Sequence, residues 1–455
     1  MNLRSEHVNS SHPVLRRLPM FGAAVALIAL AACERNNDVV LPGKRIGLLD
    51  VLGQSEATAT PEAEGTRALS LATASNNSEW AQFWGNPDAR VTHPALASSL
   101  SLAWSNPIGS GEGRKQRISA DPVVGGGLIY TLDAGATLTA TNASGQTAWR
   151  RDLTSGRNDR DAVSGGGVSY ADGRVYVSTN VGRLFVVDAT DGSEIWSQEL
   201  EATSSAAPTV SGDLVYLISG DNTGWALEKD SGRVRWQIGA VEDVNNVFGA
   251  PSPVVTSDLA IFAFGSGDVQ AVFRRGGLRR WDSAVVGERL GYALSKVGDI
   301  TAGPVVVGDT IFVGNQSGRV VALDVGSGKR IWTAFDGAAG PIWPAGDSVF
   351  FVSDRNELLR LDAQTGAKIW GTRLPNFTTE RLRRQVEVFA HFGPILAGGR
   401  LVLASSDGQL RSFDPESGAE LGAVEIPGGG AATGPAIAGN TLYVVNARGD
   451  LLAYR

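Results

Sequence analysis

The sequence has almost no cysteine, with a single one, Cys33, among 455 residues. One cysteine excludes an intramolecular disulfide, and it excludes zinc and iron–sulfur sites that need several thiolates. Histidine is also scarce: there are four, and His7 and His12 lie close to the amino terminus. The sequence shows neither the spacing of metal ligands nor the Ser-His-Asp arrangement of hydrolases. Nothing in it therefore favours metal-dependent or nucleophilic catalysis.

The chain also lacks an excess of basic residues. It has 40 Lys and Arg against 47 Asp and Glu, which gives a net charge of −7. Because nucleic-acid binding needs concentrated positive charge, this composition argues against such a partner. Short basic runs such as Arg381–Arg384 are interpreted as solvated loop faces. Hydrophobic residues make up 43% of the chain and there are 57 glycines, as expected of a folded protein rich in turns.

A long apolar run is missing too. The run from Met20 to Leu30 is too short to cross a bilayer, and it follows Arg16 and Arg17 as in a signal peptide. It ends in Leu30-Ala31-Ala32-Cys33, which resembles the bacterial lipobox. The resemblance implies removal of residues 1–32 as a lipoprotein signal peptide and lipidation of Cys33. The alternative is an ordinary cleaved signal with a chance cysteine.

Residues 33–78 are predicted to be a flexible tether that carries the lipid at Cys33. They include Ser55–Gly65, a stretch of small, acidic and polar residues with few large apolar ones. Glu34 follows the cysteine. In the lipoprotein sorting pattern that this resembles, an Asp at that position favours the inner membrane, so Glu34 favours the periplasmic face of the outer membrane.

What the chain has in abundance is a repeat. Its best copy, Gly308–Trp332, contains three short apolar segments separated by glycine turns and ends in tryptophan. The repeat interval of about 45 residues suits the blade of a β-propeller. The repeated tryptophan is expected to dock between adjacent blades, and the repeated aspartates to cap the turns that follow them. Copies of the tryptophan stand at Trp104, Trp149, Trp196, Trp236, Trp281, Trp332 and Trp370, with Gly422 in the eighth position.

The two ends of the chain predict how the ring closes. The last copy stops at Arg455 without its tryptophan strand, while the strand around Trp104 has no repeat before it. Joining these two halves completes one blade and removes an exposed sheet edge. Residues 79–455 are therefore predicted to form an all-β, eight-bladed propeller closed by pairing of its terminal strands. A seven-bladed ring with an extra half-repeat is the alternative.

The repeat, with Leu-Asp, Ser/Thr-Gly and Trp, resembles that of propellers with PQQ-like repeats, and Trp80–Pro87 resembles their opening segment. Together with the lipobox, the tether and the eight-blade length, it is similar to the family of outer-membrane protein assembly factor BamB. That resemblance implies a monomeric scaffold lipoprotein without a cofactor. Such a scaffold binds the POTRA domains of the barrel subunit BamA, assembles with other subunits, and helps outer-membrane proteins to insert.

The resemblance also implies where the partner binds. The family's first docking loop falls here on Asn245, Val247 and Phe248, which depart from its leucine–x–leucine–arginine pattern. Its second loop falls on Lys296, Asp299 and Thr301, where Thr301 replaces an acid. Phe248 is expected either on an exposed loop or packed into the ring.

Two other functions stay open. A quinoprotein dehydrogenase resembles this chain in its repeats and would use PQQ with calcium in the axial channel. Many such enzymes carry a vicinal disulfide, which a chain with one cysteine cannot form. An envelope sensor or adaptor with another protein partner is the second alternative.

Overall fold

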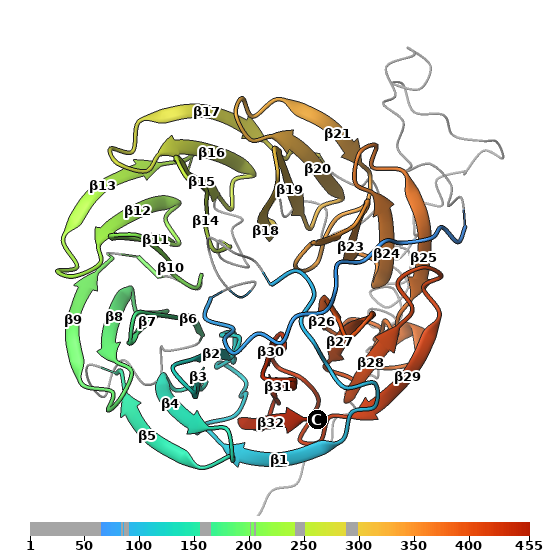
Figure 1. The fold of residues 1–455 in the computed structure, drawn as a ribbon, viewed down its shortest axis with the longest axis horizontal. Helices are drawn as coiled ribbons and strands as arrows, with labels where there is room; N and C mark the ends of the chain where they lie inside the picture. Colours follow the sequence, from blue (N-terminus) through green and yellow to red (C-terminus); the bar gives the residue numbers. More distant parts are fainter. Residues whose placement is uncertain are drawn as a thin grey trace, which may run out of the picture. The chain divides into compact units, whose positions relative to one another are not determined.

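A computed structural model describes residues 65–82, 85, 91–154, 165–200, 202–203, 206–241, 251–287 and 299–455. This part of the chain forms eight four-stranded antiparallel sheets, which stand around a central axis as the blades of a propeller (Figure 1). The prediction of an all-β, eight-bladed ring is confirmed, and the seven-bladed alternative is excluded. The described residues contain no helix with the length and apolarity needed to cross a membrane.

The strands run outward from the axis in chain order within each of the first seven blades. The first three blades contain β2 (Val123–Gly125), β3 (Leu128–Leu132), β4 (Thr137–Asn142), β5 (Thr147–Asp152), β6 (Gly166–Ala171), β7 (Arg174–Thr179), β8 (Arg183–Asp188), β9 (Glu194–Glu199), β10 (Thr209–Ser211), β11 (Leu214–Ile218), β12 (Thr223–Glu228) and β13 (Val234–Gly239). The next three contain β14 (Val254–Val255), β15 (Leu259–Ala263), β16 (Asp268–Phe273), β17 (Arg279–Ala284), β18 (Ile300–Val307), β19 (Thr310–Asn315), β20 (Arg319–Asp324), β21 (Arg330–Ala334), β22 (Trp343–Ala345), β23 (Ser348–Val352), β24 (Glu357–Asp362) and β25 (Lys368–Arg373). The last two contain β26 (His391–Ala397), β27 (Arg400–Ser405), β28 (Gln409–Phe413), β29 (Glu420–Glu425), β30 (Ala436–Ala438), β31 (Thr441–Val445), β32 (Asp450–Tyr454) and β1 (Leu102–Pro107).

The burial of each strand follows its distance from the axis. All five residues of β11 and all five of β23 are buried, because the inner strands are covered on both faces by neighbouring blades. The outer strands β9 and β13 instead alternate between exposed and half-buried residues. The hydrophobic core therefore lies between the blades.

The ring closes through the two ends of the propeller sequence. Strand β1 pairs antiparallel with β32, with Trp104 opposite Ala453 and Leu102 opposite Tyr454. One blade thus takes three strands from the end of the chain and its outermost strand from the beginning, as the sequence predicts. Among the described residues, every blade therefore has all four of its strands.

The repeated tryptophans join each blade to the next one. In every case the indole N–H donates to a backbone carbonyl in the outer turn of the following blade, at 2.7–3.2 Å. Each ring also lies against the glycine of that turn so closely that a Cβ there would meet it at 2.4–2.8 Å. The pairs are Trp104–Gly145, Trp149–Gly192, Trp196–Gly232, Trp236–Gly277, Trp281–Gly328, Trp332–Gly366 and Trp370–Gly418.

The exception at Gly422 follows from the way the ring closes. A tryptophan on β29 would have to dock on the outer turn of the eighth blade. That blade has no such turn, because β32 ends the chain and its outer neighbour β1 comes from the beginning. Gly422 accordingly faces open space, and the two blades are joined instead by the Tyr454 hydroxyl, which donates to the Glu425 carbonyl at 2.8 Å.

Replacing Gly232 with Ala should destabilise the ring more than replacing Gly173 with Ala. Both glycines have φ near +70°, so each substitution costs about 1 kcal/mol in the backbone alone. A Cβ at Gly232 would also lie 2.5 Å from the Trp196 ring, whereas one at Gly173 meets nothing within 4 Å. Overpacking should add about 1–3 kcal/mol at Gly232. Urea unfolding measures the difference, and equal losses would contradict the docking role of the tryptophan.

The repeated aspartates cap the outer turns, also as expected. The Asp324 carboxylate accepts a hydrogen bond from the Ser327 backbone N–H at 2.8 Å, and Asp414 does the same for Ser417. Asp188 and Asp362 bond turn N–H groups in the same way.

One face of the ring is crossed by the segment of residues 65–82, here called the strap (Figure 1). The strap begins at the sixth blade, where Arg67 pairs with Asp362 at 2.8 Å. It passes the seventh and eighth blades, where Asn77 donates to the Ile437 carbonyl. It ends at the third blade, where the side-chain amide of Gln82 donates through Nε2 to the Val210 carbonyl and accepts the Val210 N–H through Oε1. The last part of the expected tether, residues 65–78, therefore lies on the ring.

A buried histidine holds the middle of the strap. Nε2 of His93 accepts a hydrogen bond from the backbone N–H of Gly399 at 2.9 Å. Because that nitrogen accepts, Nδ1 carries the proton and donates to the carbonyl of Ala72 at 2.6 Å. One neutral imidazole thus links the strap to the turn between β26 and β27.

Candidate functional site

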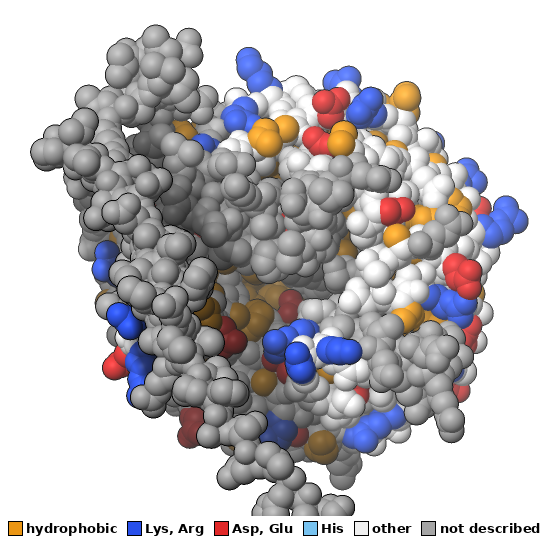
Figure 2. Space-filling view, turned by 180° about the vertical axis from the view of Figure 1, so that it is seen from behind, with side chains coloured by type: hydrophobic (Ala, Val, Ile, Leu, Met, Phe, Trp, Pro, Cys, Tyr) orange, Lys and Arg blue, Asp and Glu red, His pale blue; other side chains and the backbone are white. Residues whose placement is uncertain are grey.

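A cavity of about 530 Å³ lies at the axis of the ring, between the strap and the opposite face. Its walls come from the segments that lead into the innermost strands, whereas the strap crosses the far ends of those strands. On the face opposite the strap the surface is hollowed near its centre, with hydrophobic side chains inside the hollow (Figure 2). A cavity of this size, with apolar walls and a few polar groups, is typical of a ligand site.

One position of the repeat recurs around the wall of the cavity. In each blade, one residue of the innermost strand pairs with a central residue of the second strand. The position described here lies two residues before that innermost-strand residue, so the strand registers identify it in all eight blades. The eight equivalents are Asp121, Gly167, Ala207, Ser252, Gly303, Pro341, Gly393 and Gly434. All of them except Gly303 line the cavity. Seven are small residues or proline, and only Asp121 bears a charge.

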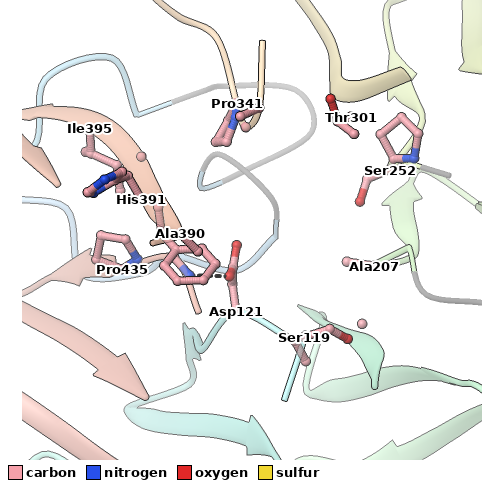
Figure 3. Close-up of a pocket in the computed structure, with 18 of the residues that line it drawn as sticks. Ser119, Asp121, Ala207, Ser252, Thr301, Pro341, Ala390, His391, Ile395 and Pro435 are labelled. Atoms are coloured by element: carbon pink, nitrogen blue, oxygen red, sulfur yellow. Dashed lines mark hydrogen bonds between the residues drawn. The ribbon is translucent and has the colours of Figure 1, made fainter. Parts of the chain in front are cut away.

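Asp121 reaches into the space that the labelled residues of Figure 3 surround. Its Oδ1 accepts a hydrogen bond from the Gly434 backbone N–H at 2.7 Å, across the boundary between the first and eighth blades. Loss of solvent around the carboxyl raises its pKa to about 6, and the hydrogen bond from Gly434 offsets part of that rise.

Two other polar groups in the wall differ in how they are satisfied. His391, at the start of β26, bonds the Ser405 hydroxyl through Nδ1 at 2.7 Å and the Pro375 carbonyl through Nε2 at 2.8 Å. Burial lowers its pKa, so the ring is neutral at neutral pH. Oε1 of Gln316, by contrast, is buried and has no hydrogen-bond partner among the described residues.

The strap forms the floor of the cavity. Trp80 pairs with Val124 as an isolated β-bridge, and its indole stacks on that of Trp343 with ring centroids 6.4 Å apart. Both indoles are buried. Trp80 and Gln82 line the cavity, so the axial channel is narrowed from the strap side.

The predicted docking residues are placed only in part. Asn245, Val247, Phe248 and Lys296 lie outside the described residues, as does the predicted lipid site Cys33. Thr301 is half-buried in the cavity wall and donates to the Ala338 carbonyl at 2.6 Å.

Asp299 differs from the exposed contact expected of it. It is fully buried, and its carbonyl accepts the backbone N–H of Gln316 at 3.2 Å. Asp299 directly precedes β18, at the point where the chain enters the ring, and it is covered by surrounding residues there.

Comparison with known proteins gives three results. A family model described as outer membrane protein assembly factor BamB matches residues 134–372. An outer membrane protein assembly factor BamB of Shewanella oneidensis is 23% identical over 358 residues, covering 77% of this chain and 87% of the relative. The Escherichia coli protein of the same description is 23% identical over 348 residues, covering 76% and 86%.

Solved structures share the fold. BamB from Moraxella catarrhalis superposes with a TM-score of 0.61 at 18% identity, covering 79% of this chain and 98% of that structure. Quinohemoprotein alcohol dehydrogenase from Comamonas testosteroni gives a TM-score of 0.63 at 16% identity, covering 84% and 81%. Since both identities are low and the scores are similar, the structural likeness alone does not separate a scaffold from an enzyme.

Proposed function

The chain belongs to the family of outer membrane protein assembly factor BamB, and from this membership we propose that it is a non-enzymatic scaffold of the machinery that assembles outer-membrane β-barrels. In this proposal it is anchored through a lipid on Cys33 to the periplasmic face of the outer membrane. It binds the POTRA domains of a BamA-like barrel subunit and promotes insertion of outer-membrane proteins. The match of the family model over residues 134–372 carries the proposal.

The closed ring suits a docking platform. Eight blades are joined by seven tryptophan contacts and by a shared terminal blade, so the described strands form one connected framework. A partner that binds to such a framework does not have to order it, which limits the loss of conformational entropy on binding. The surface proposed to dock the partner lies around residues 245–248 and 296–301.

The cavity wall supports the choice of a scaffold over a quinoprotein dehydrogenase. Pyrroloquinoline quinone is a tricarboxylate and would need cationic groups around it. Among the described residues that line the cavity there is no Lys or Arg, while Asp121 and Asp354 are acidic. The described wall therefore does not fit that cofactor.

Combining Phe248→Asp with Lys296→Glu should weaken recovery of the barrel subunit at least about tenfold in a pull-down of the membrane-anchored protein. Loss of one apolar anchor and reversal of one charge at an interface commonly cost 2 kcal/mol or more, by rough estimate. Asp299 is left unchanged because it is buried.

The control is Val386→Asp, since Val386 is 87% exposed on another loop of the ring and is not a proposed contact. Unchanged recovery with the double variant, at wild-type thermal stability, would place the docking surface elsewhere.

A further inference from the structure

We propose that the axial cavity binds an organic cation, an ammonium group carried on an apolar body. The site lies between the strap-side floor at Trp80 and the ring of residues equivalent to Asp121. This inference does not rest on the scaffold function, although Thr301, a predicted docking residue, also lines the cavity.

The charges of the wall point to a cation. The carboxyl of Asp121 lines the cavity, and no Lys or Arg does so among the described residues. His391 does not add a positive charge to the wall, because both of its ring nitrogens are hydrogen-bonded and burial keeps the imidazole neutral. Gln316 Oε1 adds a buried acceptor that has no donor within the described part of the chain. The described wall therefore presents hydrogen-bond acceptors. These suit a ligand that donates hydrogen bonds and carries a positive charge.

The repeat shows that a blade does not require a carboxyl at the position of Asp121. The same position is filled by glycine, alanine, serine or proline in the seven other blades, which fold in the same way. In this proposal the carboxyl has two roles: it accepts the Gly434 N–H, and it meets a ligand that enters the shared cavity.

Asp121 also lowers the stability of the fold at neutral pH. Its pKa is about 6 in the folded chain against 3.8 for an ordinary aspartate. The folded state therefore binds this proton more tightly than the unfolded state, and stability falls as pH rises from about 4 to about 6. Above that range the Asp121 carboxyl is ionised and the loss of folding stability has reached its full size. A bound cation would offset this loss.

The apolar and aromatic residues of the wall indicate that the rest of the ligand is apolar. The apolar residues Val123, Val168, Val388, Phe389 and Ile395 line the cavity. Phe389 and Trp80 offer aromatic rings, which attract cations. No cluster of three or more metal-ligating side chains occurs among the described residues. The site therefore suits an amine with a hydrocarbon or aromatic body better than a bare metal ion.

Isothermal titration calorimetry of the full chain with phenethylammonium chloride tests the proposal. We expect saturable binding of one ligand per chain at about pH 8, and about tenfold weaker binding at about pH 5, where most of the Asp121 carboxyl is protonated. The neutral 2-phenylethanol and the anionic 3-phenylpropionate should bind at least about tenfold more weakly than the amine.

Asp121→Asn should weaken phenethylammonium binding at least about tenfold and remove its dependence on pH. Asp213→Asn is the matched control, because Asp213 is an exposed carboxylate in the turn between β10 and β11, at the strap-side ends of the strands. If Asp121→Asn fails to fold, the pH dependence and the three-probe comparison on the wild-type protein still decide. Equal affinities for the three probes, no binding of the amine, or unchanged binding by Asp121→Asn would overturn the proposal.

The same experiment separates two sources of the cation. A free amine and a lysine side chain share the chemistry, so the blocked peptide N-acetyl-Leu-Lys-Leu-amide is titrated beside phenethylammonium. Peptide binding that is lost in Asp121→Asn supports a polypeptide ligand. Binding of the free amine alone supports a small-molecule ligand.

Discussion

Replacing Cys33 with Ser should move the protein out of the outer-membrane fraction almost completely. The expected lipids attach to the Cys33 sulfur and to the amino group that cleavage exposes, so the substitution removes both anchors. Each buried methylene contributes roughly 0.8 kcal/mol, and stable anchoring needs at least two acyl chains. Sedimentation of membranes and mass spectrometry of the mature amino terminus measure the outcome. A soluble or uncleaved species is expected.

The matched control is Asn36→Ser, which introduces the same residue three positions later. It should keep wild-type fractionation and a lipidated amino terminus. Outer-membrane fractionation of the Cys33→Ser protein would show that another part of the molecule, or a partner, holds it there.

Replacing Arg360 with Leu should destabilise the propeller by about 3–5 kcal/mol, because it leaves buried polar partners without a donor. Arg360 lies on β24 and is fully buried. Burial lowers its pKa, and the nearby carboxylate of Asp347 opposes that effect. Its guanidinium donates to the Ser348 hydroxyl and to the carbonyls of Arg67, Ala68, Pro415 and Glu416.

These contacts join three parts of the molecule, namely the sixth blade, the outer turn of the seventh blade, and the strap. The control is Arg373→Leu on the neighbouring strand β25, whose side chain is 89% exposed. Its ion pair with Glu357 should contribute less than about 1 kcal/mol. Guanidinium unfolding measures both variants, and similar losses would mean that the strap is held by its other contacts.

The sequence was sufficient to predict the fold because the repeat is dictated by packing. Each tryptophan needs a turn glycine and a carbonyl in the next blade, so the residues recur at blade spacing. The same logic explains the one failure of the pattern. Gly422 marks the place where the next blade has no outer turn to receive a tryptophan.

The candidate site was harder to predict because its residues meet only in three dimensions. Asp121 and Gly434 are hydrogen-bonded but lie at opposite ends of the propeller sequence. A signal was present, since Ala120-Asp121-Pro122 aligns with Ala206-Ala207-Pro208 in the repeat. The seven other blades have a small residue or proline at this position. The common fold of the blades therefore does not explain the acid in the first blade.

The strap was missed for a different reason. Residues 65–78 have neither strand periodicity nor a repeat, and composition alone suggests a flexible segment. They are fixed by single long-range contacts, such as the one between Ala72 and His93, and a local pattern does not encode these.

The pairing of β1 with β32 has a consequence for biosynthesis. The ribosome makes β1 before every other strand of the ring and β32 after them, so the eighth blade cannot form until β32 has been synthesised. Until then the nascent chain exposes an unpaired outer strand and an unsealed core. We therefore expect its maturation to depend on chaperones that shield incomplete β-sheets, and to be slow compared with that of proteins stabilised by local contacts.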